Sequence, residues 1–288
     1  MSNFAVSAEP LLRIGELSRR VGVTTHRLRA WETRYGVLRP GRSSGGFRLY
    51  SEADEARVRE MLAQLSNGLS AAEAARRAVR AGASPPPDEC VDRLASAIAR
   101  FDARAADEVL DGVLAAHGAE VAMREVIFPY LHRLGVAWER GEIHVGQEHF
   151  ASHLLERRLL ALLGDAGNAG DGPPALLACP PGERHSLALT GLAVTLRLRG
   201  RRVVFLGADT PMETLATTAD AVRPAVVVLA VTMAHCLAAA GNRIAEIARS
   251  HGVALAGAAV DSERAAGFGG VHLAGDPVSA GAALGRVT

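Results

Sequence analysis

The chain has 288 residues, a formal net charge of +1 and 49% hydrophobic residues. This length predicts two or three domains with buried cores, and the near-zero net charge gives no overall preference for acidic or basic partners. No stretch approaches the ~18 uninterrupted apolar residues of a membrane span, and no signal peptide is expected, so we predict a cytoplasmic protein without membrane contact. Three widely spaced cysteines argue against a disulfide framework or a zinc site.

The basic residues concentrate at the start of the chain. Residues 1–82 hold 14 arginines against 8 acidic residues, an excess of +6. Residues 12–23 predict a short helix that Gly22 ends, and Thr24-Thr25 provides the N-cap of a second helix to Tyr35. Two short helices joined by a glycine-containing turn form the helix-turn-helix pattern, whose second helix enters the major groove of DNA.

A basic, glycine-rich segment and two further capped helices, to about Ser66 and Ala81, follow. Arginine-rich faces are usually only solvated, but this order of elements is more specific. It resembles the MerR family of winged DNA-binding domains, through Ile14-Gly-Glu-Leu, Arg29-Ala-Trp-Glu-Thr-Arg-Tyr-Gly36 and Gly45-Gly-Phe-Arg-Leu-Tyr-Ser51. We therefore predict a MerR-type winged helix-turn-helix domain over residues 10–82. The resemblance places Arg27, Arg29 and Arg34 at bases or phosphates, and Arg42 and Arg48 on the DNA backbone.

A proline-rich linker, residues 83–88, marks a domain boundary. Beyond it, helical periodicity predicts a four-helix bundle over residues 88–165, with helices at 89–100, 103–116, 119–140 and 146–164. Trp138 is followed, after nine residues, by Glu148-His149. Alone, this would be ordinary bundle packing, but directly before an α/β domain it resembles the helical cap of cobalamin-binding photoreceptor regulators. The resemblance implies that Trp138 covers the upper face of a corrin, with Glu148 and His149 beside the upper axial group.

Strands and helices alternate over residues 174–288. Continuous apolar strands such as Val226–Val231 indicate a parallel sheet that is covered on both faces. We predict a five-stranded, flavodoxin-like α/β domain. The expected strands are residues 175–179, 202–206, 225–231, 253–257 and 271–274.

His185 lies in the loop after the first of these strands, where open α/β folds place their ligands. From its position alone, a surface or helix-capping histidine is the more common interpretation. Cobalamin-binding forms of this fold carry Glu/Asp-x-His-x-x-Gly in the same loop, and Glu183 and His185 match that pattern. The resemblance implies that His185 ligates cobalt from below while Glu183 tunes its basicity. The predicted cofactor residues are Trp138, Glu148, His149, Glu183, His185, Asp209, Thr210, Thr232 and Gly257, with His185 as the metal ligand.

The three segments in this order resemble the CarH/LitR family of adenosylcobalamin-dependent, light-responsive transcriptional repressors. The resemblance implies a regulator rather than an enzyme, which binds promoter DNA in the dark as a dimer or tetramer and releases it on photolysis. A corrinoid-carrier subunit of a methyltransferase or mutase is an alternative, since the last two segments also occur there.

Several positions depart from the family pattern. Ala188, Ala230 and Ala256 replace the usual Gly, Ser and Gly, and the nearest hydroxyl to the second position is Thr232. A regulator that acts without cobalamin, or with a different corrinoid, is therefore a further alternative.

Another departure concerns the upper side of the predicted cofactor. In well-known members a histidine follows the tryptophan and can take the upper position of cobalt after photolysis. Glu139 stands there in this chain. His144 or His149 could serve instead.

Overall fold

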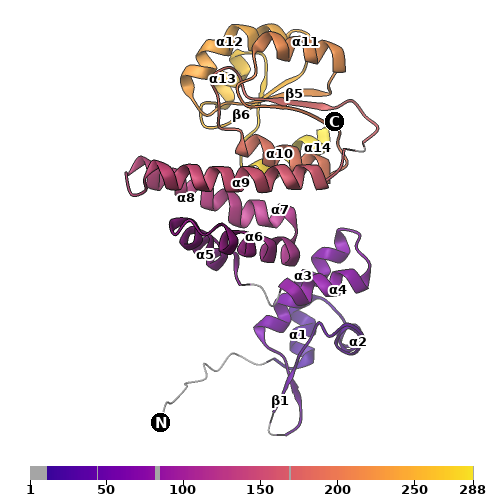
Figure 1. Cartoon of the computed structure of the whole chain (residues 1–288). Coiled ribbons are helices and arrows are strands. Elements are labelled where there is room, and N and C mark those ends of the chain that lie inside the picture. The colour runs from indigo at the N-terminus through magenta and orange to yellow at the C-terminus, as the bar shows by residue number, and fades with distance from the viewer. Residues whose placement is uncertain (1–11, 44, 82–84, 169, 288) are drawn as a thin grey trace. The chain divides into compact units, whose positions relative to one another are not determined.

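The computed structural model describes residues 12–43, 45–81, 85–168 and 170–287 (Figure 1). The chain divides into two compact units. The first contains residues 1–94 and 104–122, and the second contains residues 95–103 and 123–288. Among the described residues, no helix combines the length and apolar character that crossing a membrane requires.

The first unit begins with a winged helix-turn-helix head, as predicted. Its elements are α1 (Ile14–Val21), α2 (Thr25–Tyr35), β1 (Gly41–Arg42), β2 (Arg48–Leu49), α3 (Glu52–Ser66) and α4 (Ala71–Ala81). Gly22 ends α1 in the left-handed region at φ 69°, and the Thr24 side chain accepts the backbone N–H of Arg27 at 3.3 Å to start α2. β1 and β2 pair antiparallel and form the wing.

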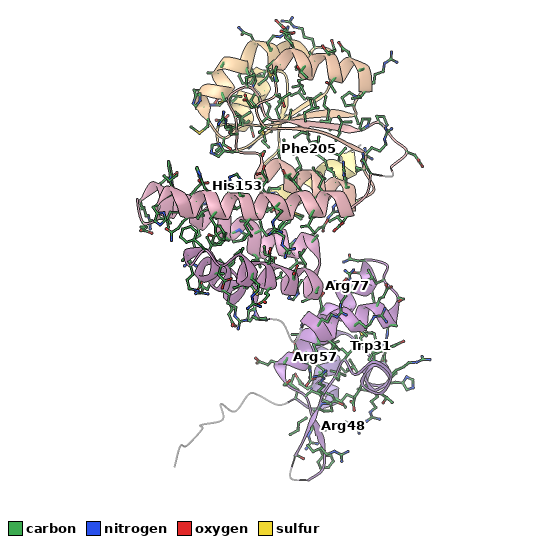
Figure 2. The ribbon with its side chains drawn as sticks, viewed as in Figure 1. Trp31, Arg48, Arg57, Arg77, His153 and Phe205 are labelled. Atoms are coloured by element: carbon green, nitrogen blue, oxygen red, sulfur yellow. The ribbon has the colours of Figure 1, made fainter. Side chains whose placement is uncertain are left out.

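A buried carboxylate organises the head between the wing and α3. Asp54 is 1% exposed and accepts the backbone N–H groups of Arg39 at 2.7 Å and Ser51 at 2.9 Å. It also forms an ion pair with Arg57, which lies inside the head (Figure 2). Because Ser51 caps α3 and Arg39 precedes the wing, Asp54 ties both to one point. The apolar core around it includes Leu17, Leu28, Trp31, Tyr50 and Met61.

Helices α5 (Pro87–Ala99), α6 (Ala103–His117), α8 (Phe128–Glu139) and α9 (Val145–Asp165) occupy the middle of the chain. α8 is preceded by α7 (Ala119–Val121) and a π-helical turn, η1 (Ala122–Ile127), which the helical periodicity did not indicate. One of the boundaries between the two units falls inside η1. The grouping of these helices into one domain over residues 88–165 stays a prediction.

The second unit contains the predicted flavodoxin-like sheet. Its five parallel strands have the order β4-β3-β5-β6-β7, the 2-1-3-4-5 order of that fold. The strands are β3 (Ala175–Ala178), β4 (Val203–Gly207), β5 (Val226–Ala230), β6 (Val253–Ala256) and β7 (Val271–His272). The helices are α10 (Leu187–Leu198), α11 (Met212–Val222), α12 (Ala234–Ala248), α13 (Ser262–Gly267) and α14 (Pro277–Val287).

Helices cover both faces of this sheet, which explains why β3 and β5 are buried along their whole length. α11 and α12 lie on one face, and α10 and α14 pack together on the other, with α9 along α10 (Figure 1). The strand order reverses at β3, the switch point where this fold forms a crevice beyond the carboxyl ends of its strands. The loop that carries His185 leaves β3 at that crevice.

The buried Asp54 gives the first testable prediction. Replacing Asp54 with Ala leaves the Arg57 guanidinium without its carboxylate partner, and removing one member of a buried ion pair typically costs about 3–5 kcal/mol. We expect the D54A variant to lower the unfolding free energy of the head by that order, measured by urea unfolding with the fluorescence of the buried Trp31 in a W138F background. An E52A variant, at an exposed position of the same helix, is the control. Equal stability of the two variants would contradict this role for Asp54.

Candidate cofactor cavity and nucleic-acid interface

Glu183 is the most constrained polar side chain of the second unit. It has no exposed surface, and one carboxylate oxygen accepts the backbone N–H groups of Thr232 at 2.7 Å and Met233 at 2.8 Å. The other oxygen accepts the backbone N–H of His185 at 3.0 Å and lies 2.6 Å from its Nδ1. One carboxylate therefore joins the loop after β3 to the loop after β5.

Two opposing effects act on the acidity of Glu183. Burial raises the pKa of its carboxyl group, while the hydrogen bonds from Met233, His185 and Thr232 together lower it further, so the net pKa lies below the ordinary value. The group is therefore ionised at neutral pH. An ionised partner at Nδ1 fixes the imidazole orientation.

The loop after β4 holds the His185 loop from the other side. The Asp209 carboxylate accepts the backbone N–H of Gly182 at 2.7 Å, and the Asp209 N–H donates to the Glu183 carbonyl at 2.9 Å. The Thr210 N–H donates to the Cys179 carbonyl at 2.9 Å, and its buried hydroxyl donates to a carbonyl of its own loop. In the structure, Asp209 and Thr210 thus support the His185 loop, and their contact with a cofactor stays a prediction.

The His185 ring is exposed and has one nitrogen that the loop does not occupy. Its side chain is 60% exposed although its loop is anchored on two sides. Since Nδ1 faces the Glu183 carboxylate, Nε2 is the nitrogen available to a ligand outside the loop. An oriented imidazole with a carboxylate behind it is a common arrangement at protein metal sites.

A cavity of about 640 Å³ opens beside His185, within the second unit. Its helical wall comes from α8 and α9, and its α/β wall comes from the loops after β3 and β5 and the start of α10. The lining residues are Phe128, Leu131, His132, Leu134, Gly135, Trp138, Glu148, Ser152, His185, Leu187, Ala188 and Thr232. The volume and the mostly apolar lining are typical of cofactor sites.

The cavity brings together four of the predicted cofactor residues: Trp138, Glu148, His185 and Thr232. Trp138 is 52% exposed, an unusual amount of uncovered apolar surface for a tryptophan. Glu148 accepts a hydrogen bond from the Ser152 hydroxyl at 2.6 Å. These residues define a site with an imidazole on one wall and an indole on the other.

The other histidines considered for the upper side do not line this cavity. His149 is exposed, lies 3.6 Å from the Glu148 carboxylate and contacts the edge of His153. His144 starts α9 and stacks on Phe101 with 5.9 Å between ring centroids. A role for His149 beside the axial group therefore stays a prediction without support from the cavity lining.

His132 lines the cavity and was missed by the sequence analysis. The available signal was helical spacing, since Phe128, His132, Gly135 and Trp138 recur every three or four residues and share one face of α8. Ser152, one turn after Glu148 on α9, was missed for the same reason.

Gly257 has a structural requirement of its own. It adopts φ +104°, and an added Cβ would lie within 3.0 Å of backbone atoms of Val231. The glycine thus allows the ends of β5 and β6 to approach closely. Ala230 is 7% exposed at the end of β5, whereas Ala188 is exposed and lines the cavity, so the methyl of Ala188 is the altered position that a ligand there would contact.

The predicted DNA-contacting arginines are all exposed on the head: Arg27, Arg29, Arg34, Arg42 and Arg48. Arg27 lies over the Trp31 ring at 4.8 Å from its centroid, which fixes the guanidinium on the face of α2. On the wing, Arg48 (Figure 2) donates to one Glu32 oxygen at 2.9 Å, and the Tyr50 hydroxyl donates to the other at 2.8 Å. Glu32 therefore locks the wing to α2.

A hollow of about 310 Å³ lies between this wing and the start of α1. Three arginines line it, Arg13, Arg29 and Arg48, and Arg13 stacks over the exposed Phe47 ring at 5.0 Å from its centroid. Guanidinium groups that converge on one hollow can bind a phosphate. The sequence analysis missed Arg13 and Phe47, because only the fold brings the wing tip to the start of α1.

Comparison with known proteins finds relatives of both the head and the helices that follow it. Residues 12–78 match the MerR HTH family regulatory protein family, and residues 90–163 match the B12 binding domain family. The HTH-type transcriptional repressor CarH of Myxococcus xanthus is 36% identical over 233 residues, 75% of this chain and 77% of CarH. The chain belongs to the CarH/LitR family.

Two further similarities fit this family membership. The HTH-type transcriptional repressor CarA of Myxococcus xanthus is 34% identical over 228 residues, 78% of this chain and 77% of CarA. The monomethylamine corrinoid protein of Methanosarcina barkeri superposes with a TM-score of 0.61 at 17% identity, over 70% of this chain and all of that protein. At 17% identity, the superposition shows only that this CarH/LitR family member shares a fold with the corrinoid protein.

The buried Glu183 of this CarH/LitR family member predicts a pH-dependent stability. Because the pKa of Glu183 is lowered in the folded state, its contribution is complete above the unfolded pKa of about 4.3 and is lost as the pH falls through the folded value. The E183Q variant should unfold about 1–3 kcal/mol more easily than wild type at pH 7, since it disrupts an ionised acceptor of buried N–H groups. Denaturant unfolding followed by circular dichroism, at pH 7 and in acid, measures this difference.

An E213Q variant is the control, because Glu213 is exposed and its surface ion pair with Arg243 contributes little. A difference between E183Q and wild type that stays constant from pH 7 to pH 3 would contradict the role of the Glu183 carboxylate.

Proposed function

We propose that the protein is a light-responsive transcriptional repressor that binds adenosylcobalamin in the cavity beside His185 and promoter DNA through its winged head. The observation that carries this proposal is a cavity with an oriented, exposed imidazole on one wall and a half-exposed indole on the other. It occurs in a chain whose head presents arginines on a helix-turn-helix and a wing.

The donor set fits a cobalt corrinoid. Imidazole is a suitable ligand for a mid-row transition metal, and Glu183 keeps the His185 ring in one orientation for that purpose. When bound, adenosylcobalamin supplies a cobalt–carbon bond that light can break. Trp138 would cover the upper side, and Glu148, held by Ser152, would offer a polar anchor there.

His132 is the histidine that we assign to the upper side. It is the lining imidazole of the helical wall, whereas the lining imidazole of the α/β wall is His185. Glu139 is exposed after Trp138 at the end of α8 and does not line the cavity. His132 would therefore take the role that a histidine after the tryptophan has in the well-known relatives.

The head would bind DNA mainly through electrostatic contacts. Arg27, Arg29 and Arg34 lie on α2, which would enter the major groove, and Arg42 lies on the wing strand. The hollow that Arg13 lines would receive a backbone phosphate. A single small head reads few base pairs, so self-association in the dark would raise promoter affinity by avidity.

Absorption spectroscopy of the purified protein with adenosylcobalamin, in the dark and after illumination, tests the cofactor assignment. Wild type should bind with a spectral change that marks replacement of the cofactor's own base by His185, and the H185A variant should lose that change. The H132A variant should bind in the dark and differ from wild type only after illumination. H153A, at an exposed histidine of α9 outside the cavity lining, should behave as wild type.

A wild-type protein that neither binds the cofactor nor responds to light would refute the proposed function. Identical spectra for H185A and wild type would exclude cobalt ligation at that histidine. Identical illuminated spectra for H132A and wild type would exclude the upper-side assignment.

The salt dependence of promoter binding tests the DNA assignment. Each lost phosphate contact should reduce the slope of log K against log salt by about 0.9. We expect R13A and R29A to bind promoter DNA more weakly and with a smaller slope, in gel-shift titrations at several salt concentrations. R19A, whose side chain is 78% exposed and paired with Glu16 on α1, is the control. Unchanged slopes for R13A and R29A would show that the hollow takes no phosphate.

A further inference from the structure

Gly191 occupies a position in α10 where glycine has no local advantage. It lies in the middle of a helix whose residues 189–196 are all buried, and glycine destabilises a helix interior relative to alanine. Its backbone is helical rather than left-handed, so the chain path does not require glycine. The reason for a glycine must therefore lie in what packs against it.

Phe128 packs directly on Gly191. A Cβ added at Gly191 would lie 3.0 Å from Cε2 of the Phe128 ring and closer still to Cζ, nearer than side chains tolerate. Phe128 is the first residue of α8 and is half-buried, and it also lines the cavity. The aromatic ring thus fills the space that a methyl group on α10 would need.

This contact joins the two walls of the cavity. α10 begins with Leu187 and Ala188, which belong to the α/β wall, and α8 provides most of the helical wall. Trp138 lies ten positions after Phe128, about 15 Å along a helix. α8 contacts α10 through Phe128, the first residue of α8. The distance between the two helices at this contact therefore sets the distance between the rest of the α8 face and the α/β wall.

We propose that Phe128 and Gly191 form the spacer that sets the height of the cavity and thereby its selectivity for a thin, flat ring. The contact holds the α8 face close to the α/β wall, so a flat ring is gripped on both sides. A larger residue at either position would move α8 away from the α/β wall and leave one side of the bound flat ring uncovered. Phe128 and Gly191 are thus positioning residues, and their role as a selectivity element rests on the proposed cofactor function.

Four variants of the full chain test this spacer: G191A, F128L, the double variant F128L/G191A, and the control G164A. Gly164 is a helical glycine of α9 with no atom within 4 Å of an added Cβ. Titration with adenosylcobalamin in the dark, followed by absorption, should give about tenfold weaker binding for G191A. G164A should bind as wild type. The smaller leucine makes room for the methyl, so the double variant should bind more tightly than G191A.

A second measurement needs no cofactor. Trp31 and Trp138 are the two tryptophans of the chain, so a W31F background reports on Trp138 alone. In this background G191A should shift the Trp138 emission maximum, because the helix that carries it is displaced, whereas G164A should not. This readout separates the spacer from the cofactor assignment if wild type fails to bind adenosylcobalamin.

Each outcome of these two measurements either supports the spacer or contradicts it. Weaker binding by G191A with partial recovery in the double variant supports the spacer, and so does a Trp138 emission shift specific to G191A. If G191A matches G164A in both measurements, the spacer is wrong. If the double variant is no better than G191A, the methyl acts through some contact other than Phe128, and the proposal is equally overturned.

Discussion

The rest of the cavity depends on the hydrogen bonds that the Glu183 carboxylate accepts. A buried negative charge is costly unless several donors face it, and here three backbone N–H groups and one imidazole nitrogen do so. These donors come from loops after different strands, so satisfying one charge fixes where those loops stand. The His185 ring is therefore also held in place, although more than half of its side-chain surface is exposed. An exposed imidazole can thus be held in a fixed position without being buried.

The two walls of the cavity are constrained in different ways. Glu183 and Asp209 tie the α/β wall by hydrogen bonds to the backbone, whereas the helical wall meets α10 through side-chain packing, by α9 along α10 and by Phe128 of α8 on Gly191. Backbone hydrogen bonds from several sides fix the position of a loop in every direction. The packing of an aromatic ring fixes mainly the distance between the two helices that it joins. Trp138 at the other end of α8 keeps half of its surface exposed. The helical wall is therefore held by packing rather than by hydrogen bonds to its backbone.

The sequence was informative wherever a feature depends on residues that are close together in the chain. Apolar runs predicted the parallel strands, and the Glu183-x-His185 spacing predicted a loop in which the two side chains meet, since both features are local in the sequence. It was uninformative where residues distant in sequence meet. Arg13 meets Arg48 only because the wing folds back to the start of α1. The fit of Phe128 on Gly191 likewise depends on two helices whose contact no periodicity encodes. The π-helical turn η1 was missed because its sequence remains compatible with an ordinary helix.

The head shows why charge alone does not identify a DNA contact. Arg48 lies on the wing among the predicted backbone-contacting residues, yet its guanidinium is bound to Glu32, which also receives the Tyr50 hydroxyl. Burial, followed by the hydrogen bond to Glu32, raises the pKa of Tyr50, so its hydroxyl keeps its proton. A neutral hydroxyl and a cation sharing one carboxylate form a stable bridge between wing and α2. Such a bridge fixes the spacing between α2 and the wing, and a fixed spacing is what a rigid DNA duplex requires of any protein that contacts a groove with one element and the backbone with another.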